Sequence, residues 1–262
     1  MKVLSLILLS TVFLVGGCDD GRVDSSGCQV KEPAAMADSN DKIVVLVFDD
    51  GTVSQYKAGK LLCEYGFGGT FFISEADFKF HDDPKMNWTQ IKELHDIGLE
   101  IGNHTYTHFD TTKLSKEDFF KELKGIEDLC ESHDIPKPVT MAYPGYHAND
   151  TVAGYMKEAG YLYAREGGGA AFDPQTDDPH RMPTCASYSV PSEDGRLDPP
   201  GDTMQYFIDC VSLAKDGKVA VVTYHGIPDM HNVEVALFKQ HLDYLKNNDY
   251  TCIAMRDIHL YR

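Results

Sequence analysis

The feature that most limits the fold of this chain is the regular alternation of strand-like and helix-like segments from residue 43 onward. Short apolar runs typical of buried strands occupy residues 43–48, 69–74, 99–104, 139–145, 161–165, 218–226 and 251–255. Segments with helical spacing of apolar residues, or with helix start and stop signals, lie between them at residues 56–65, 88–97, 115–131, 151–159 and 233–246. Such alternation predicts an α/β fold with a parallel sheet, either a barrel or an open doubly wound sheet.

One long stretch does not follow this alternation. Residues 167–202 are rich in Gly, Pro and Asp and show no apolar period. We expect this stretch to be an irregular loop, because loops of this length inside compact domains are usually functional or poorly ordered.

The strand at 43–48 ends in two adjacent carboxylates, Asp49 and Asp50, followed by Gly51. Two other predicted strands also end in ionisable side chains, His104 with His108 after one and His225 after the other. Each feature alone is common in turns and structural contacts. Because the carboxyl ends of parallel strands gather at one edge of the sheet, their shared position predicts a common site.

Two imidazoles and one carboxylate form the ligand set of a catalytic metal site that keeps open positions. His104 and His108 are four residues apart, close enough to bind one ion from the same side. Asp50 is the candidate carboxylate ligand, and Asp49 is then free to act as a general base toward a water activated by the ion. This division of tasks explains how two neighbouring carboxylates are tolerated.

At these residues the chain resembles the NodB-homology polysaccharide deacetylases, carbohydrate esterase family 4. The resemblance rests on FDDG at 48–51, HTYTH at 104–108, AYPG at 142–145 and VVTYHG at 221–226. It implies a distorted (β/α) barrel and a divalent metal, usually zinc, that cleaves N- or O-acetyl groups from sugars. It also implies that Asp49 is the base and His225 the general acid, with Asp50, His104 and His108 as metal ligands.

The chain departs from this family pattern at two motifs. Ala142 stands where the family usually has an arginine that orients the catalytic aspartate, and we hypothesise that Arg165 replaces it. Gly145 follows Pro144, so its backbone N–H is the candidate oxyanion donor, and Tyr146 is assigned to the substrate side. The fourth motif is not recognisable, which leaves the group that orients His225 open.

The first residues have the pattern of an export signal. A basic Lys2 precedes an apolar run, which is followed by small residues and Cys18. We expect a signal peptide at 1–17, lipidation of Cys18 as in bacterial lipoproteins, a flexible tether at 18–41 and a catalytic domain at 42–262. These segments predict an exported, membrane-anchored protein of the cell envelope.

The composition of the chain limits the classes of partner that it can bind. The net charge of −17 argues against nucleic acid, because no basic field exists to attract it, and we expect no obligate protein partner. Six cysteines other than Cys18 permit disulfides in an exported chain, with the pairing left open.

The function predicted is removal of acetyl groups from a polysaccharide or amino-sugar oligomer. Hydrolysis of linear non-peptide amides or imides, and carbohydrate binding by a catalytically weak relative, remain as alternatives.

Overall fold

A computed structural model describes residues 28–30, 42–76, 84–188, 204–225 and 232–261. Its strands are β1 (Lys42–Phe48), β2 (Thr70–Ile73), β3 (Glu100–Asn103), β4 (Thr140–Ala142), β5 (Tyr163–Arg165), β6 (Ala186–Tyr188), β7 (Val219–Tyr224) and β8 (Tyr250–Ile253). All pairs among the described strands are parallel, in the order β5-β4-β3-β2-β1-β7-β6, and β8 pairs with the first half of β1. The predicted α/β fold with a parallel sheet is therefore confirmed.

The sheet curls into a distorted barrel that does not close between β5 and β6 by strand pairing in the described chain. The segment between these two strands narrows the gap, because Met182 pairs with Arg165 and Phe172 pairs with Val219 through isolated bridges. The barrel predicted from the family resemblance is thus present in its distorted form.

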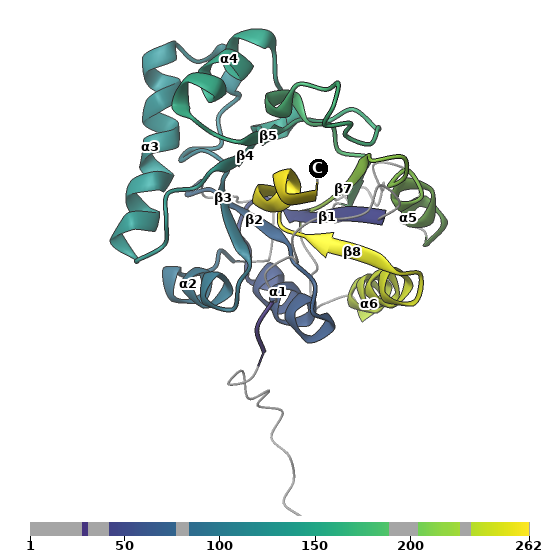
Figure 1. The fold of residues 1–262 in the computed structure, drawn as a ribbon. Helices are drawn as coiled ribbons and strands as arrows, with labels where there is room; N and C mark the ends of the chain where they lie inside the picture. The colour runs from purple at the N-terminus through teal and green to yellow at the C-terminus, as the bar shows by residue number, and fades with distance from the viewer. Residues whose placement is uncertain (1–27, 31–41, 77–83, 189–203, 226–231, 262) are drawn as a thin grey trace, which may run out of the picture.

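Helices surround the strands on the outside (Figure 1). They are α1 (Val53–Tyr65), α2 (Trp88–Asp96), α3 (Lys116–Ser132), α4 (Asp150–Ala159), α5 (Met204–Val211) and α6 (Asn232–Asn247). Short 3-10 helices are η1 (Thr111–Lys113), η2 (Pro144–Tyr146), η3 (Pro179–Arg181) and η4 (Met255–Tyr261). Ser115 caps α3 by accepting a hydrogen bond from the Asp118 amide, as the sequence predicted, and Gly160 ends α4 in the left-handed conformation.

Two elements were missed by the sequence analysis. Strand β6 lies inside the stretch predicted to be irregular, and α5 is the next element along the described chain. A strand of three residues carries too little periodicity to be recognised, and it forms here because its register partner is the long buried strand β7.

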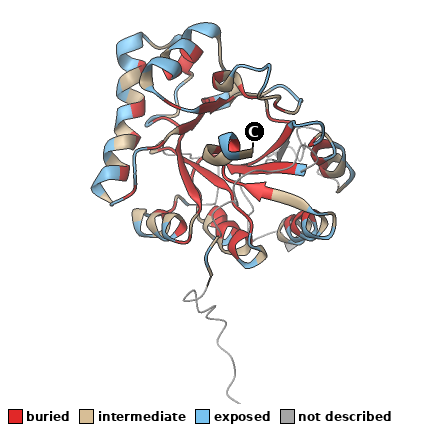
Figure 2. Cartoon of the chain, viewed as in Figure 1, coloured by how far each residue is buried: buried red, intermediate tan, exposed pale blue. Residues whose placement is uncertain are grey.

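The two faces of β1 supply two different cores. Ile43, Val45 and Val47 point into the barrel, whereas Val44 and Leu46 pack against the surrounding helices. This alternation follows from the two-residue period of a strand, and Figure 2 shows the resulting buried centre of the fold. The C-terminal helix η4 contributes to the inner core and lies over one end of the barrel (Figure 1).

Only three residues of the predicted tether at 18–41 are described, and they contact the domain. Cys28 forms a disulfide with Cys63 of α1, and the Val30 amide donates to the Ile97 carbonyl at 2.8 Å. The predicted signal peptide at 1–17 and the predicted lipid anchor at Cys18 lie outside the described residues. Within the described part, no helix has the length and apolar character needed to cross a bilayer.

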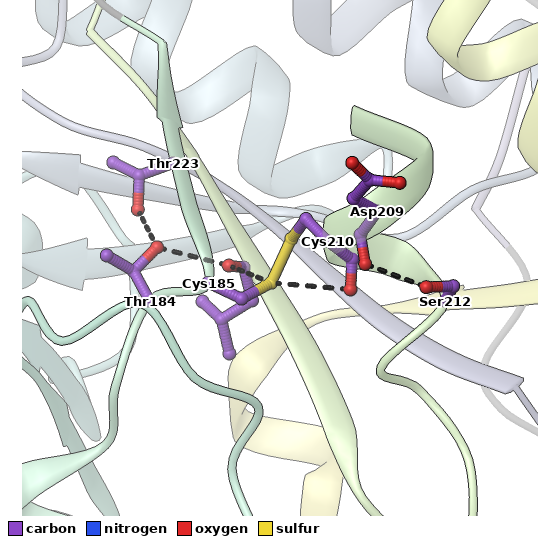
Figure 3. Close-up of a disulfide and its surroundings, with 7 residues drawn as sticks. Thr184, Cys185, Asp209, Cys210, Ser212 and Thr223 are labelled. Carbon is purple, nitrogen blue, oxygen red and sulfur yellow. Dashed lines mark hydrogen bonds between the residues drawn. A yellow bond between two sulfur atoms is a disulfide. The ribbon is translucent and has the colours of Figure 1, made fainter. Parts of the chain in front are cut away.

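The remaining described cysteines divide into one bridge and two thiols. Cys185 and Cys210 form the second disulfide, which joins the start of β6 to α5 (Figure 3). Cys130 and Cys252 are free and buried, and burial raises the pKa of the Cys130 thiol to about 12. These two thiols are therefore packing residues rather than nucleophiles.

The Cys185–Cys210 bridge holds an edge of the sheet next to β7. Beside it, the hydroxyls of Thr184 and Thr223 lie 2.8 Å apart (Figure 3). The Cys185 amide donates to the Val221 carbonyl at 2.9 Å. These contacts attach the short strand β6 to the strand that ends one residue before His225.

We expect a Cys185→Ala/Cys210→Ala variant to lose about 3–4 kcal/mol of unfolding free energy, because the bridge closes a loop with a sequence separation of 25. Urea unfolding under oxidising conditions measures this loss. In a reducing buffer the variant and the original chain should become nearly equal in stability. Equal stability under oxidising conditions would contradict the prediction.

A buried histidine makes the fold sensitive to acid. His241 in α6 stacks on Phe207 with 3.9 Å between ring centroids, and it contacts the Tyr224 hydroxyl at 2.9 Å. Burial lowers the pKa of His241 to about 3. In the unfolded chain, His241 therefore takes up a proton below its ordinary pKa of 6.5, whereas in the folded chain the His241 imidazole stays neutral.

His241 should accordingly stabilise the fold fully only above pH 6.5, and its contribution should decrease as the pH falls toward about 3. The expected slope is about 1.4 kcal/mol per pH unit over this range. Urea unfolding of His241→Gln between pH 4 and pH 7 should show a shallower slope than the original chain. The exposed His259→Gln serves as the control and should leave the slope unchanged.

Candidate active site

The site lies at the carboxyl ends of the parallel strands. Asp49 and Asp50 follow β1, and His104 follows β3. Arg165 ends β5, and His225 follows β7. The parallel register pairs Phe48, the last residue of β1, with Tyr224, the last residue of β7, so these two strands end at the same level and Asp49 and His225 follow side by side. The edge predicted from the sequence is the edge at which these side chains meet.

Asp50, His104 and His108 form one cluster of potential metal ligands. One ligand atom from each residue lies within 4.8 Å of those of the other two. Asp50 Oδ1 is 3.5 Å from the Nε2 atoms of both histidines, and it is buried without a hydrogen bond in the described chain. A buried carboxylate oxygen that faces two imidazole nitrogens fits a divalent cation between them.

The orientation of His104 supports this fit. Its Nδ1 lies 2.7 Å from the carbonyl oxygen of Ala142, which can only accept, so Nδ1 carries the proton. Nε2 is then the lone-pair nitrogen, and it is the atom that faces Asp50. A backbone carbonyl that sets the tautomer of a histidine in this way is a common support for metal ligands. Ala142, which lacks the side chain of the family's arginine, still contributes through its backbone.

The electrostatics keep two of the candidate ligands, Asp50 and His108, in the forms that bind a cation. Burial on its own raises the pKa of Asp50, but the contact with His104 and the charges of the surrounding histidines lower it to about 2. Burial also lowers the pKa of His108 to about 4, with a contribution from the charge on His104. At neutral pH, Asp50 is therefore an anion and His108 is neutral.

The loops that carry these ligands are strained. Asp50, Thr105 and His108 have φ angles of 80°, 62° and 55°, a region that residues with a Cβ atom rarely occupy. Strain of this kind persists only where the surrounding contacts impose it, and it gathers at functional sites. Here it turns Asp50 and the two histidines toward one point.

Asp49 pairs with Arg165, the residue hypothesised to replace the family's arginine. The Arg165 Nη2 atom donates to both carboxylate oxygens of Asp49, and the Arg165 side chain is fully buried. The guanidinium also lies over the Tyr146 ring at 4.8 Å from its centroid. Burial opposes ionisation of Asp49, but the charges on Arg165, His104 and His225 together outweigh it, and the pKa of this carboxyl is lower than its ordinary value.

His225 completes the cluster from the end of β7, the strand that pairs with β1. Its Nε2 atom lies 3.6 Å from Asp49 Oδ2 and 3.4 Å from the Tyr146 hydroxyl. Tyr146 therefore contacts both the arginine beside the predicted base and the predicted acid. Gly145, the candidate oxyanion donor, is exposed on the adjoining helix η2 with a φ of 62°.

Two supporting residues were missed by the sequence analysis. The Asn103 side chain accepts from the Thr105 amide at 2.8 Å and donates to the Leu123 carbonyl at 3.0 Å. The Glu122 carboxylate accepts from the amide and the hydroxyl of Thr107, both at 2.7 Å. The two residues tie the loop that carries His104 and His108 to α3. Asn103, directly before a predicted ligand on a buried strand, was the available signal, whereas Glu122 looks like any surface residue of an amphipathic helix.

Comparison with known proteins agrees with this geometry. The family model described as polysaccharide deacetylase matches residues 37–164. A peptidoglycan-N-acetylglucosamine deacetylase of Bacillus cereus is 32% identical over 125 residues, which cover 47% of this chain and 55% of the relative. A chitin deacetylase of Arthroderma benhamiae is 32% identical over 123 residues, covering 45% of this chain and 32% of that protein. The chain thus spans about half, or less, of the length of these relatives.

Solved structures extend the similarity to most of the fold. The chitin deacetylase of Colletotrichum lindemuthianum aligns with a TM-score of 0.60 at 18% identity, covering 85% of this chain and 89% of that one. A family 4 carbohydrate esterase from Bacillus anthracis aligns with a TM-score of 0.56 at 18% identity, covering 86% of each chain. The residues matched by the family model include Asp49, Asp50, His104 and His108, whereas Arg165 and His225 lie beyond the end of that match.

Proposed function

Because this chain belongs to the polysaccharide deacetylase family through residues 37–164, we propose that it is a metal-dependent hydrolase that removes acetyl groups from a polysaccharide or amino-sugar oligomer. The residues proposed to act are Asp49 as base, His225 as acid, and Asp50, His104 and His108 as ligands of zinc or another divalent ion.

The observation that carries this proposal is the separation of the two neighbouring carboxylates. Asp50 faces two imidazole nitrogens, while Asp49 faces a guanidinium and a third imidazole. One carboxylate is thus oriented as a ligand, and the other is held ionised beside it. A site that only binds sugar has no use for a base and an acid on either side of a metal position.

A divalent cation bound to Asp50, His104 and His108 supplies Lewis acidity, polarising the acetyl carbonyl and making the attacking water more acidic. Asp49 removes the proton from that water, because Arg165 keeps the carboxylate ionised and fixes its orientation. The backbone N–H of Gly145 is the proposed donor to the oxygen that gains negative charge.

His225 gives a proton to the leaving nitrogen or oxygen of the sugar. Its Nε2 atom is 3.6 Å from Asp49, so the base and the acid lie close enough to act on one carbonyl carbon. Tyr146, which contacts His225 and Arg165, orients this pair and lines the substrate side.

A polar pocket beside Tyr146 provides room for a neighbouring sugar. Its volume is about 480 Å³, and its walls include Asn149, Glu166, Gly167 and Arg181. Side chains that both donate and accept hydrogen bonds suit a hydroxyl-rich ligand.

Release of acetate from chitin oligosaccharides, peptidoglycan and acetylated xylan, measured with and without added zinc, tests the proposal. We expect metal-dependent release from at least one of the three. Turnover of small linear amides or imides in place of these substrates would establish the second candidate activity. Bound metal with no turnover of any substrate would identify a binding protein.

We also propose that residues 1–17 are a signal peptide, that Cys18 carries lipid, and that the domain at 42–262 acts at the cell envelope. The arrangement of Lys2, the apolar run and Cys18 supports this. Cys18→Ser should move the protein from the membrane fraction to the soluble exported fraction. An unchanged membrane fraction would contradict the lipid anchor.

A further inference from the structure

Gln55 is a buried amide at the base of the site for which neither the family motifs nor the proposed chemistry has a role. It is the third residue of α1, which begins soon after the Asp49–Asp50 turn, and its exposed fraction is 0%. Its side-chain nitrogen donates to the carbonyl of Asp49 and to the carbonyl of His225, the latter at 2.8 Å.

Both partners are backbone carbonyls, which can only accept hydrogen bonds. The NH₂ group must therefore be the end of the amide that faces them. The other end, Oε1, is buried without a hydrogen-bond partner in the described chain. A buried amide that leaves its oxygen unsatisfied is costly, so the two donated bonds are the feature that this residue provides.

These two carbonyls lie where the ladder between β1 and β7 ends. The last backbone bond between the two segments runs from the Asp49 amide to the Tyr224 carbonyl at 2.9 Å. Beyond this bond, the chain from Asp49 leads into α1. Gln55 continues the ladder with a side chain and connects the backbone of the predicted base to that of the predicted acid.

We propose that Gln55 is a positioning residue that sets the spacing between Asp49 and His225. The inference rests on the proposed function, since these two residues are its base and acid. Within the described residues, the Gln55 side chain makes no hydrogen bond to the proposed metal ligands, and it acts through the backbones of Asp49 and His225. Two groups therefore fix the distance of 3.6 Å between Asp49 Oδ2 and His225 Nε2. The Gln55 amide bonds to the backbones of both residues, and the Tyr146 hydroxyl contacts the His225 side chain.

The test compares Gln55→Met, which keeps the length of the side chain and removes both donors, with Gln55→Asn, which keeps the amide on a shorter stem. Leu62→Ala is the control, because Leu62 is fully buried in the same helix and far along it from the site. All variants are made in the full chain, and kcat, KM, zinc affinity and Tm are measured.

We expect Gln55→Met to lower kcat by about 10- to 100-fold, because small misplacements of reacting groups cost this much, with KM and zinc affinity within about twofold. Gln55→Asn should fall between Gln55→Met and the original chain. Leu62→Ala should lower Tm at least as much while leaving kcat nearly unchanged. A loss of kcat that simply follows Tm across all three variants would overturn the inference.

Hydrogen exchange of backbone amides tests the two hydrogen bonds from Gln55 without any substrate. In Gln55→Met, peptides that contain residues 47–50 and 222–225 should exchange about tenfold faster, as expected when about 1.4 kcal/mol of local stability is lost. Exchange at β3 and β4 should not change. Unchanged exchange at the ends of β1 and β7 would refute the role of Gln55, whereas altered exchange with no acetate release from any substrate would refute only the proposed function.

Discussion

Replacing Asp50 with asparagine should abolish tight binding of a divalent ion and reduce acetate release by about a thousandfold or more. The side chain keeps its shape in this variant, but the only anionic ligand of the cluster Asp50–His104–His108 loses its charge. Lewis acidity of a bound ion is worth several kcal/mol to the transition state, and each 1.4 kcal/mol is a factor of ten in rate.

Metal-dependent stability gives this prediction a second readout. An ion present at about a thousand times its Kd should stabilise the original chain by about 4 kcal/mol, and removing it with a chelator should reverse that gain. Asp50→Asn should show no such gain. The exposed Asp128→Asn on α3 is the matched control, with stabilisation by zinc and turnover like the original chain. An Asp50→Asn protein that is still stabilised by zinc would show that the ion binds elsewhere.

Replacing Arg165 with alanine should be the most destabilising single change at the site. Arg165 and Asp49 are both buried, and the guanidinium neutralises the carboxylate. Removing one member of such a pair leaves a buried charge without compensation, which costs about 3–5 kcal/mol of unfolding free energy. Urea unfolding at pH 7 measures this loss.

The pH dependence separates this effect from a simple loss of packing. In the original chain the pKa of Asp49 is lowered, so its contribution to stability is present above the ordinary value of 3.8 and is lost as the pH falls through the folded-state pKa. Arg165→Ala removes the charge that lowers the Asp49 pKa most, so burial should outweigh the remaining histidines and raise that pKa. The variant should therefore lose the most stability at neutral pH and much less in acid.

The same shift should appear in the kinetics. With Asp49 partly protonated, kcat/KM of Arg165→Ala should fall by about a hundredfold or more at pH 7, and the acid limb of its pH profile should move to higher pH. The double variant Asp49→Asn/Arg165→Met removes both charges and should recover much of the stability but not the activity. If Arg165→Ala alone leaves turnover unchanged, the orienting role is wrong.

Much of the fold followed from local patterns. The apolar run of β1 and the signals that bound α3 and α4 are each properties of a few neighbouring residues, and these elements lie close to the ranges that the sequence indicated. Three residues of β6 and the single-residue bridge at Met182 could not be predicted, because they pair only when β5 and β7 are already in place.

The same division applies to the site. The order of Asp49, Asp50, His104, His108 and His225 along the chain, each next to the end of a predicted strand, determined that they could meet, because parallel strands bring their carboxyl ends to one edge. Which atoms face each other was decided by tertiary structure. The bond from Arg165 to Asp49, the Ala142 carbonyl that sets the tautomer of His104 and the two bonds from Gln55 all join residues from different strands or helices. Contacts of this kind depend on where separate elements pack against each other. The spacing of residues within one strand or helix therefore does not predict them.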